Sequence, residues 1–200
     1  RRWAGPVGQF QYHDQHAYDP DLSSTAQDVT LNVETVNLGA SNARLVAGTN
    51  VIAIHALNVA HTNANFVFSG SLGIAAASPV TLVNATDTWQ YFPGVVEPAG
   101  GLYDPALLFS GRLSVPWGKA AFDDSLWTQG PGPHGQGLAG MGTTVSGVVG
   151  NTPSLYTRIV FNASAADAAD ANPLQLLVDY DDSFVAYING VEVARANLQN

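Results

Sequence analysis

The chain of 200 residues has no cysteine, a single lysine (Lys119) and few charged residues of either sign. Without cysteine, disulfide frameworks, thiolate metal sites and cysteine nucleophiles are excluded. No uninterrupted apolar run approaches the roughly 18 residues of a transmembrane helix, so we expect no membrane span. Charged residues make up 12% of the chain, about half of the roughly 25% in an ordinary soluble domain. The 7 basic residues are scattered and outnumbered by 16 acidic ones, which argues against nucleic acid as a partner.

What the chain does contain is β-forming sequence with frequent turns. Hydrophobic residues make up 46% of it, enough to fill a core and to argue against disorder. The 20 glycines and 11 prolines separate short apolar runs, a pattern typical of a β-sandwich or jelly roll. We therefore expect an all-β fold. The predicted strands are residues 29–36, 51–57, 66–74, 80–83, 155–161, 174–180, 184–188 and 191–195.

The connections between these runs have recognisable chemistry. Asn189-Gly190 joins the last two strands, and this dipeptide favours a type I′ hairpin turn because both residues tolerate positive φ. Residues 181–183 (Asp-Asp-Ser) predict another tight turn. The Ala-rich residues 163–171 leave room for one helical turn at most. Residues 129–151 are rich in Gly and Pro, and we expect a long irregular loop there.

Two acidic clusters are candidate metal sites. Asp179, Asp181 and Asp182 form one, and Asp123 and Asp124 form the other. Calcium prefers carboxylate and carbonyl oxygens supplied by loops, so either cluster could hold a structural Ca²⁺. Aspartate at a turn also hydrogen-bonds its own backbone, which needs no metal. Structural calcium is the one cofactor that the sequence suggests, with turn formation as the alternative.

Tryptophans offer a candidate ligand site. Trp89, Trp117 and Trp127 could stack on sugar rings, as the site of a carbohydrate-binding module requires. The alternative is that these rings are part of the core. Asn84 and Asn162 begin Asn-x-Thr and Asn-x-Ser sequons, which are glycosylation acceptors in an exported protein.

Catalytic patterns are scarce in this chain. There is no G-x-S-x-G nucleophile elbow. Only three glutamates occur, and nothing points to the paired carboxylates of a glycoside hydrolase. We therefore expect that the protein is not an enzyme.

Two motifs, read together, resemble a known family. Residues 122–127 read Phe-Asp-Asp-Ser-Leu-Trp, and residues 178–195 read Val-Asp-Tyr-Asp-Asp-Ser-Phe-Val-Ala-Tyr-Ile-Asn-Gly-Val-Glu-Val-Ala-Arg. They resemble the F-D-D-S-x-W signature and the D-Y-D-D-G hairpin of galactose-binding-like jelly-roll domains. Such domains stand beside β-galactosidase-type catalytic domains and in large bacterial surface proteins. Ser183 replaces the usual Gly. The resemblance implies a jelly-roll sandwich and says little about function.

The order of the motifs is permuted. Residues 45–58 resemble a run that follows the hairpin in the family, but here they precede it. Residues 1–76 thus resemble the family's C-terminal half, 77–88 form a joint, and 89–200 resemble the N-terminal half. We expect the two segments to make one β-sandwich unit. It is either closed within a permuted chain or completed by a neighbouring copy.

These features favour a non-enzymatic extracellular or cell-surface structural protein. A surface buried between copies avoids lysine, whose side chain is costly to order and desolvate. Unpaired strand edges recruit strands from a neighbour, and head-to-tail contacts of this kind give filaments. We expect a subunit or repeat of a filament, sheath or surface layer, with copies of itself as partners. The alternatives are a carbohydrate-binding module that binds glycans and a domain of a secreted hydrolase.

Overall fold

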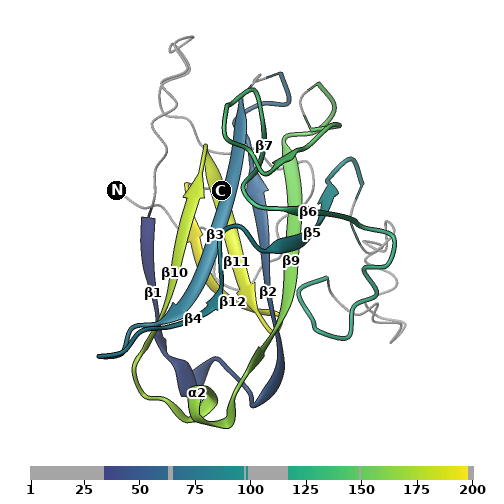
Figure 1. Cartoon of the computed structure of the whole chain (residues 1–200). Helices are drawn as coiled ribbons and strands as arrows, with labels where there is room; N and C mark the ends of the chain where they lie inside the picture. The colour runs from purple at the N-terminus through teal and green to yellow at the C-terminus, as the bar shows by residue number, and fades with distance from the viewer. Residues whose placement is uncertain (1–33, 63–64, 97, 99–116, 149, 198–200) are drawn as a thin grey trace.

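The computed structural model describes residues 34–62, 65–96, 98, 117–148 and 150–197 (Figure 1). Strands dominate this part of the chain, and they form two stacked sheets, so the expected β-sandwich is confirmed. The strands are β1 (Glu34–Ala40), β2 (Gly48–Leu57), β3 (Phe66–Ile74), β4 (Val80–Val83), β5 (Thr88–Pro93), β6 (Thr128–Pro131), β7 (His134–Gln136), β8 (Thr143–Thr144), β9 (Ser154–Ala163), β10 (Pro173–Tyr180), β11 (Ser183–Ile188) and β12 (Val191–Ala196).

Each sheet contains six strands of the described chain. In the first sheet the order is β1-β10-β3-β7-β8, with β4 also paired with β3. In the second sheet the order is β12-β11-β2-β9-β5-β6. All pairs are antiparallel except β7 with β8. Antiparallel sheets of this kind bury one face and leave the other for solvent or further packing.

The main core fills the space between the two sheets. Alternate residues of each strand point inward, as the period of two along a strand requires. From β2 these are Ile52, Ile54 and Ala56, and from β3 they include Phe66 and Phe68. Trp89 of β5 is also in this core and meets Phe68 edge-on, with ring centroids 5.9 Å apart. Gly70 packs beside these rings, because a Cβ at this position would lie 3.2 Å from Phe68 Cζ, closer than an ordinary contact.

Strands from the two ends of the chain interleave. In the first sheet β10 lies between β1 and β3, and in the second sheet β2 lies between β9 and β11. Figure 1 shows this as yellow C-terminal strands beside purple and blue N-terminal ones. The residues that resemble the family's two halves therefore pair with each other in both sheets.

Most of the described strands agree with the sequence prediction. Asn189 and Gly190 have positive φ values of 52° and 78°, as the predicted hairpin turn requires. The helix α2 (Ala165–Ala169) is a single turn, started by a capping box in which Ser164 and Asp167 exchange hydrogen bonds. The short 3-10 helix η1 spans Ser41–Ala43.

Two regions differ from the prediction. Strand β5 was not expected, because its polar Gln90 and its terminal Pro93 obscure the alternation. Residues 129–151 are not irregular throughout, since β6, β7 and β8 contain part of them. The first predicted strand, 29–36, is described only from residue 34, where β1 begins and continues to Ala40.

Candidate functional site

A second apolar cluster lies on the outer face of the second sheet. Residues 117–127 cross this face and cover it with aromatic rings. Trp117 meets Tyr187 edge-on at 5.4 Å between ring centroids, and Phe122 meets Trp127 at 5.6 Å. The cluster, called the outer cluster below, contains Ala53, Leu57, Trp117, Trp127, Tyr156, Val185 and Tyr187, with Phe92 and Phe122 packed against it. The two aromatic residues of the Phe-Asp-Asp-Ser-Leu-Trp motif thus fix this segment to the sheet.

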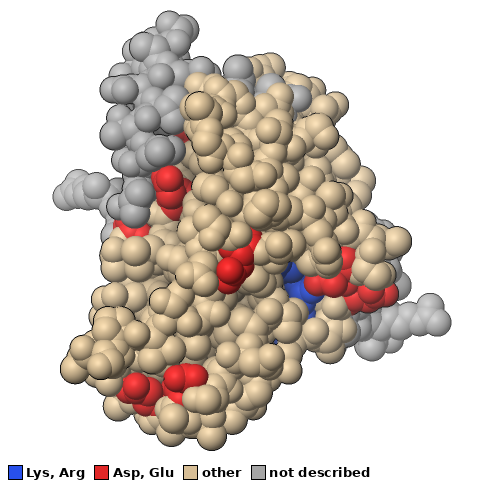
Figure 2. Space-filling view, viewed as in Figure 1, with Lys and Arg blue, Asp and Glu red and all other residues tan. Residues whose placement is uncertain are grey.

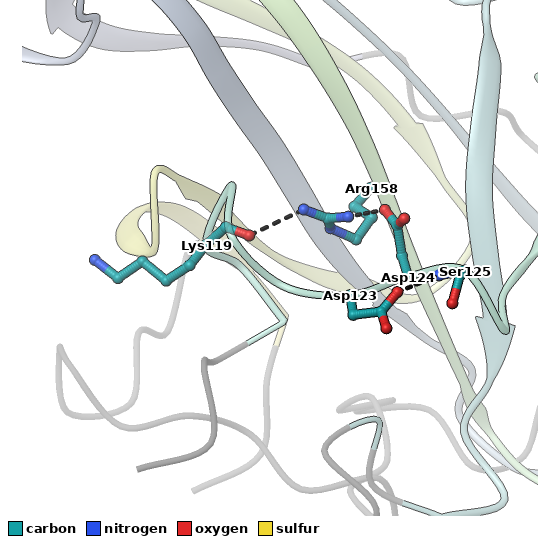
Figure 3. A network of polar contacts seen from close by, with 5 residues as sticks. All are labelled: Lys119, Asp123, Asp124, Ser125 and Arg158. Atoms are coloured by element: carbon teal, nitrogen blue, oxygen red, sulfur yellow. Dashed lines mark hydrogen bonds and ion pairs between the residues drawn. The ribbon is translucent and has the colours of Figure 1, made fainter.

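A buried ion pair holds the same segment (Figure 3). The side chain of Arg158, on β9, is only 1% exposed and pairs with Asp124. The guanidinium also donates to the backbone carbonyl of Lys119 at 2.9 Å and lies 5.5 Å from the centre of the Phe122 ring. Burial lowers the pKa of Arg158, but its ordinary value is so high that the group stays charged. Asp124 supplies the compensating charge.

Asp123, the neighbour of Asp124, has a different role. Its Oδ1 accepts a hydrogen bond from the backbone N–H of Ser125 at 3.0 Å, which closes a tight turn (Figure 3). Hydrogen bonds from the Ser125 hydroxyl and backbone lower the pKa of Asp123. The pair proposed as calcium ligands therefore consists of a turn-forming carboxylate and one whose charge Arg158 already compensates. Asp123 therefore forms a turn, which was the alternative to calcium binding. Asp124 forms an ion pair with Arg158 that the sequence does not reveal.

The second acidic cluster lies at the turn between β10 and β11. Asp182 Oδ2 accepts a hydrogen bond from the backbone N–H of Val59 at 2.6 Å, so it joins the turn to the end of β2. Asp179 Oδ1 and Asp181 Oδ2 are buried without a hydrogen-bond partner among the described residues. Burial raises the pKa of Asp179. Burial, together with the charges of Asp182 and Asp179, raises the pKa of Asp181 to about 7.

Protonation of Asp181 is one way in which the negative charge of this turn is lowered near neutral pH. Across the described residues, no group of three His, Asp or Glu side chains is arranged to hold a metal ion. Calcium binding at Asp179, Asp181 and Asp182 stays a prediction. Its test is a melting temperature that falls when EDTA is added, because a ligand bound only to the folded state stabilises it.

A histidine and a serine that the sequence did not single out lie beneath the outer cluster. His55 Nε2 hydrogen-bonds with Ser154 Oγ, and the imidazole stacks on Tyr156 with ring centroids 4.0 Å apart. Both residues are fully buried. Gly94 packs directly over the serine, since a Cβ there would lie 2.6 Å from Ser154 Oγ. The pair has the chemical types of a nucleophile and a base, but both side chains are buried away from solvent in this structure. The signal in the sequence was a histidine inside an apolar strand.

The three tryptophans proposed as a sugar site are buried. Trp89 is 1%, Trp117 6% and Trp127 8% exposed. Trp89 belongs to the core between the sheets, whereas Trp117 and Trp127 belong to the outer cluster. Stacking on a sugar requires an exposed ring face. In this structure the three rings are packing groups, which was the alternative interpretation.

Both predicted glycosylation sites lie at the surface. Asn84 is exposed beside the turn that follows β4, and Asn162 is exposed near the end of β9. The hydroxyl of Ser164, the third residue of the second sequon, accepts a hydrogen bond from Asp167 N at 3.1 Å as the cap of α2. Glycan attachment at Asn84 and Asn162 stays a prediction.

His134 is a buried titratable group within the Gly- and Pro-rich region. It is 1% exposed, and its ring lies 5.3 Å from that of Tyr91, measured between centroids. Its Nε2 has no hydrogen-bond partner among the described residues. Burial lowers the pKa of His134 to about 4, although a hydrogen bond to Gly130 acts in the opposite direction. The imidazole is therefore neutral at physiological pH.

No protein family, curated protein or solved structure matches this chain. The resemblance to galactose-binding-like domains thus depends on the motif residues alone. Within the described ranges, no helix is long and apolar enough to cross a membrane.

Proposed function

We propose that the chain is a non-enzymatic structural subunit or repeat that assembles with copies of itself outside the cell, in a filament, sheath or surface layer. The observation that carries this proposal is the burial of four described side chains whose chemical types could otherwise act on a substrate. His55, Ser154, His134 and Arg158 are all at most 1% exposed. In this structure they make hydrogen-bond, ring and ion-pair contacts with their neighbours, and a buried group cannot meet a substrate.

The distribution of charge supports self-association. Only 12% of the residues are charged, and the face seen in Figure 2 carries small separate acidic patches on a largely uncharged surface. Interface cores are depleted of charged residues because desolvating them is costly. A surface of this composition can meet a copy of itself with little like-charge repulsion, although the whole chain has a formal charge of −9.

Light scattering coupled to size exclusion, followed by electron microscopy of the purified protein, tests the proposal. We expect particles well above the 20.9 kDa of one chain, growing with concentration into extended assemblies. A compact particle of one chain at all concentrations would refute it. Turnover on a panel of glycosides and esters would contradict the non-enzymatic assignment.

A further inference from the structure

The N-terminal strands depend on the C-terminal ones for nearly all their pairing. We call residues 34–83 (β1–β4) the donor segment and residues 88–196 (β5–β12) the acceptor segment. In the described chain, β1 pairs with β10, and β2 pairs with β9 and β11. The pair of β3 with β4 is the only one inside the donor segment as described. A single hairpin beside two unpaired strands is not a stable sheet, so the donor segment needs an acceptor segment to fold.

The contact between the two segments is as extensive as a domain core. Strand β2 is in register with β9 over its whole length, from Gly48 opposite Ala163 to Leu57 opposite Ser154. Its inward side chains, among them Ile52, are fully buried against the acceptor segment. The energy of the fold therefore lies largely between the two segments.

Two asparagines make this contact specific. Asn189, in the hairpin turn of the acceptor segment, donates from Nδ2 to Asn50 Oδ1 at 2.9 Å. Its Oδ1 accepts from the backbone N–H of Val51 at 3.0 Å. Asn50 in turn donates to the Val46 carbonyl at 2.7 Å and orders the entry to β2. An acceptor segment of the same sequence reproduces these bonds, whichever chain supplies it.

The covalent connection between the segments is one exposed turn, residues 84–87. It is closed by local hydrogen bonds between Asn84 and Asp87, at 2.8 Å and 3.1 Å. One further bond, from Gly132 N to the Asp87 carbonyl at 3.1 Å, ties it to the acceptor segment. Opening this turn would break only these few bonds, and the strand pairing that the donor segment loses in its own chain would be regained against the acceptor segment of the next.

We propose that in the assembly the donor segment of one copy pairs with the acceptor segment of the next. The partner is a second copy of this chain, and the bonds made are those seen here within one chain. Each copy donates at one side and accepts at the other, so the contact is heterologous and can propagate. This inference depends on the proposed function, because it names the means by which the copies join.

Engineered disulfides test the exchange, and the chain contains no natural cysteine to interfere. Thr49 and Asn162 are exposed partners in the β2–β9 register, so T49C/N162C links donor to acceptor. After oxidation and denaturation without reductant, exchange gives a ladder at multiples of 20.9 kDa. T35C/L177C, across the β1–β10 pair of the other sheet, is expected to give the same ladder. Q90C/Q129C, which links β5 to β6 inside the acceptor segment, is the matched control and should stay at one chain.

The outcomes separate this inference from the proposed function. If the wild type assembles but both donor–acceptor disulfides form only within one chain, exchange is wrong and assembly uses another surface. If the wild type is a single-chain particle, both proposals fail. A ladder of equal extent in the Q90C/Q129C control would show that collisions cause the links, and exchange would again be rejected.

Discussion

Neutralising Asp124 is the sharpest test of how the outer cluster is held. The variant Asp124→Asn keeps the shape of the side chain but leaves the guanidinium of Arg158, 1% exposed, without its counter-charge. Removing one partner of a buried ion pair typically costs about 3–5 kcal/mol. Because Asp124 itself is 23% exposed, water can reach the site, and we expect a loss near the lower end, about 3 kcal/mol.

Urea unfolding followed by tryptophan fluorescence measures this loss, since Trp117 and Trp127 lie in the same cluster. With a slope of about 2–3 kcal/mol per molar urea, the midpoint should fall by about 1 M. Asp123→Asn is the matched control: the exposed amide oxygen can still accept the Ser125 hydrogen bond, so the midpoint should hardly move.

A double variant completes the test. Asp124→Asn combined with Arg158→Met removes both charges, and we expect it to regain part of the lost stability, because no unpaired charge stays buried. Equal midpoints for Asp124→Asn and the wild type would refute the reasoning. So would a double variant whose loss is the sum of the two single losses.

Three further predictions concern buried groups. The pKa of Asp181 is about 7 in the fold, against an ordinary value near 3.9. Its contribution to stability is therefore present at low pH and is lost as the pH rises through this range. In thermal melts at pH 8, Asp181→Asn should be more stable than the wild type. His134 behaves oppositely, because burial lowers its pKa from 6.5 to about 4. About 3 kcal/mol of the free energy of unfolding is therefore lost as the pH falls through this range. A His134→Gln variant that keeps the pH profile of the wild type would contradict this. Trp89→Ala should lower the free energy of unfolding by about 3–5 kcal/mol; loss of glycan binding with an unchanged unfolding curve would instead support a sugar site.

The family-like motifs act as fold determinants in this structure. Asp124 and Trp127 of the first motif hold residues 117–127 to the second sheet. Asn189 of the second motif bonds to Asn50, which belongs to the run that resembles a later part of the family's sequence. Residues 45–58 and 178–195, far apart in the chain, thus meet at this contact.

Much of the fold could be predicted from the sequence because its determinants are local. Short runs rich in β-forming apolar residues define the strands 51–57, 66–74 and 174–180, and the positive φ of Asn189-Gly190 follows from the residue types. The absence of cysteine and the low charge are likewise properties of composition alone.

The tertiary structure alone decided which of these elements meet. Arg158 is 34 positions from Asp124 in the sequence, and no spacing rule connects them, yet packing buries the guanidinium where it pairs with that carboxylate. The same holds for His55 with Ser154 and for Asn50 with Asn189. Burial and partnership, rather than residue type, determine whether a tryptophan is a ligand platform or core, and whether an aspartate closes a turn or neutralises a buried cation. Both depend on long-range strand pairing, which composition and local periodicity do not encode.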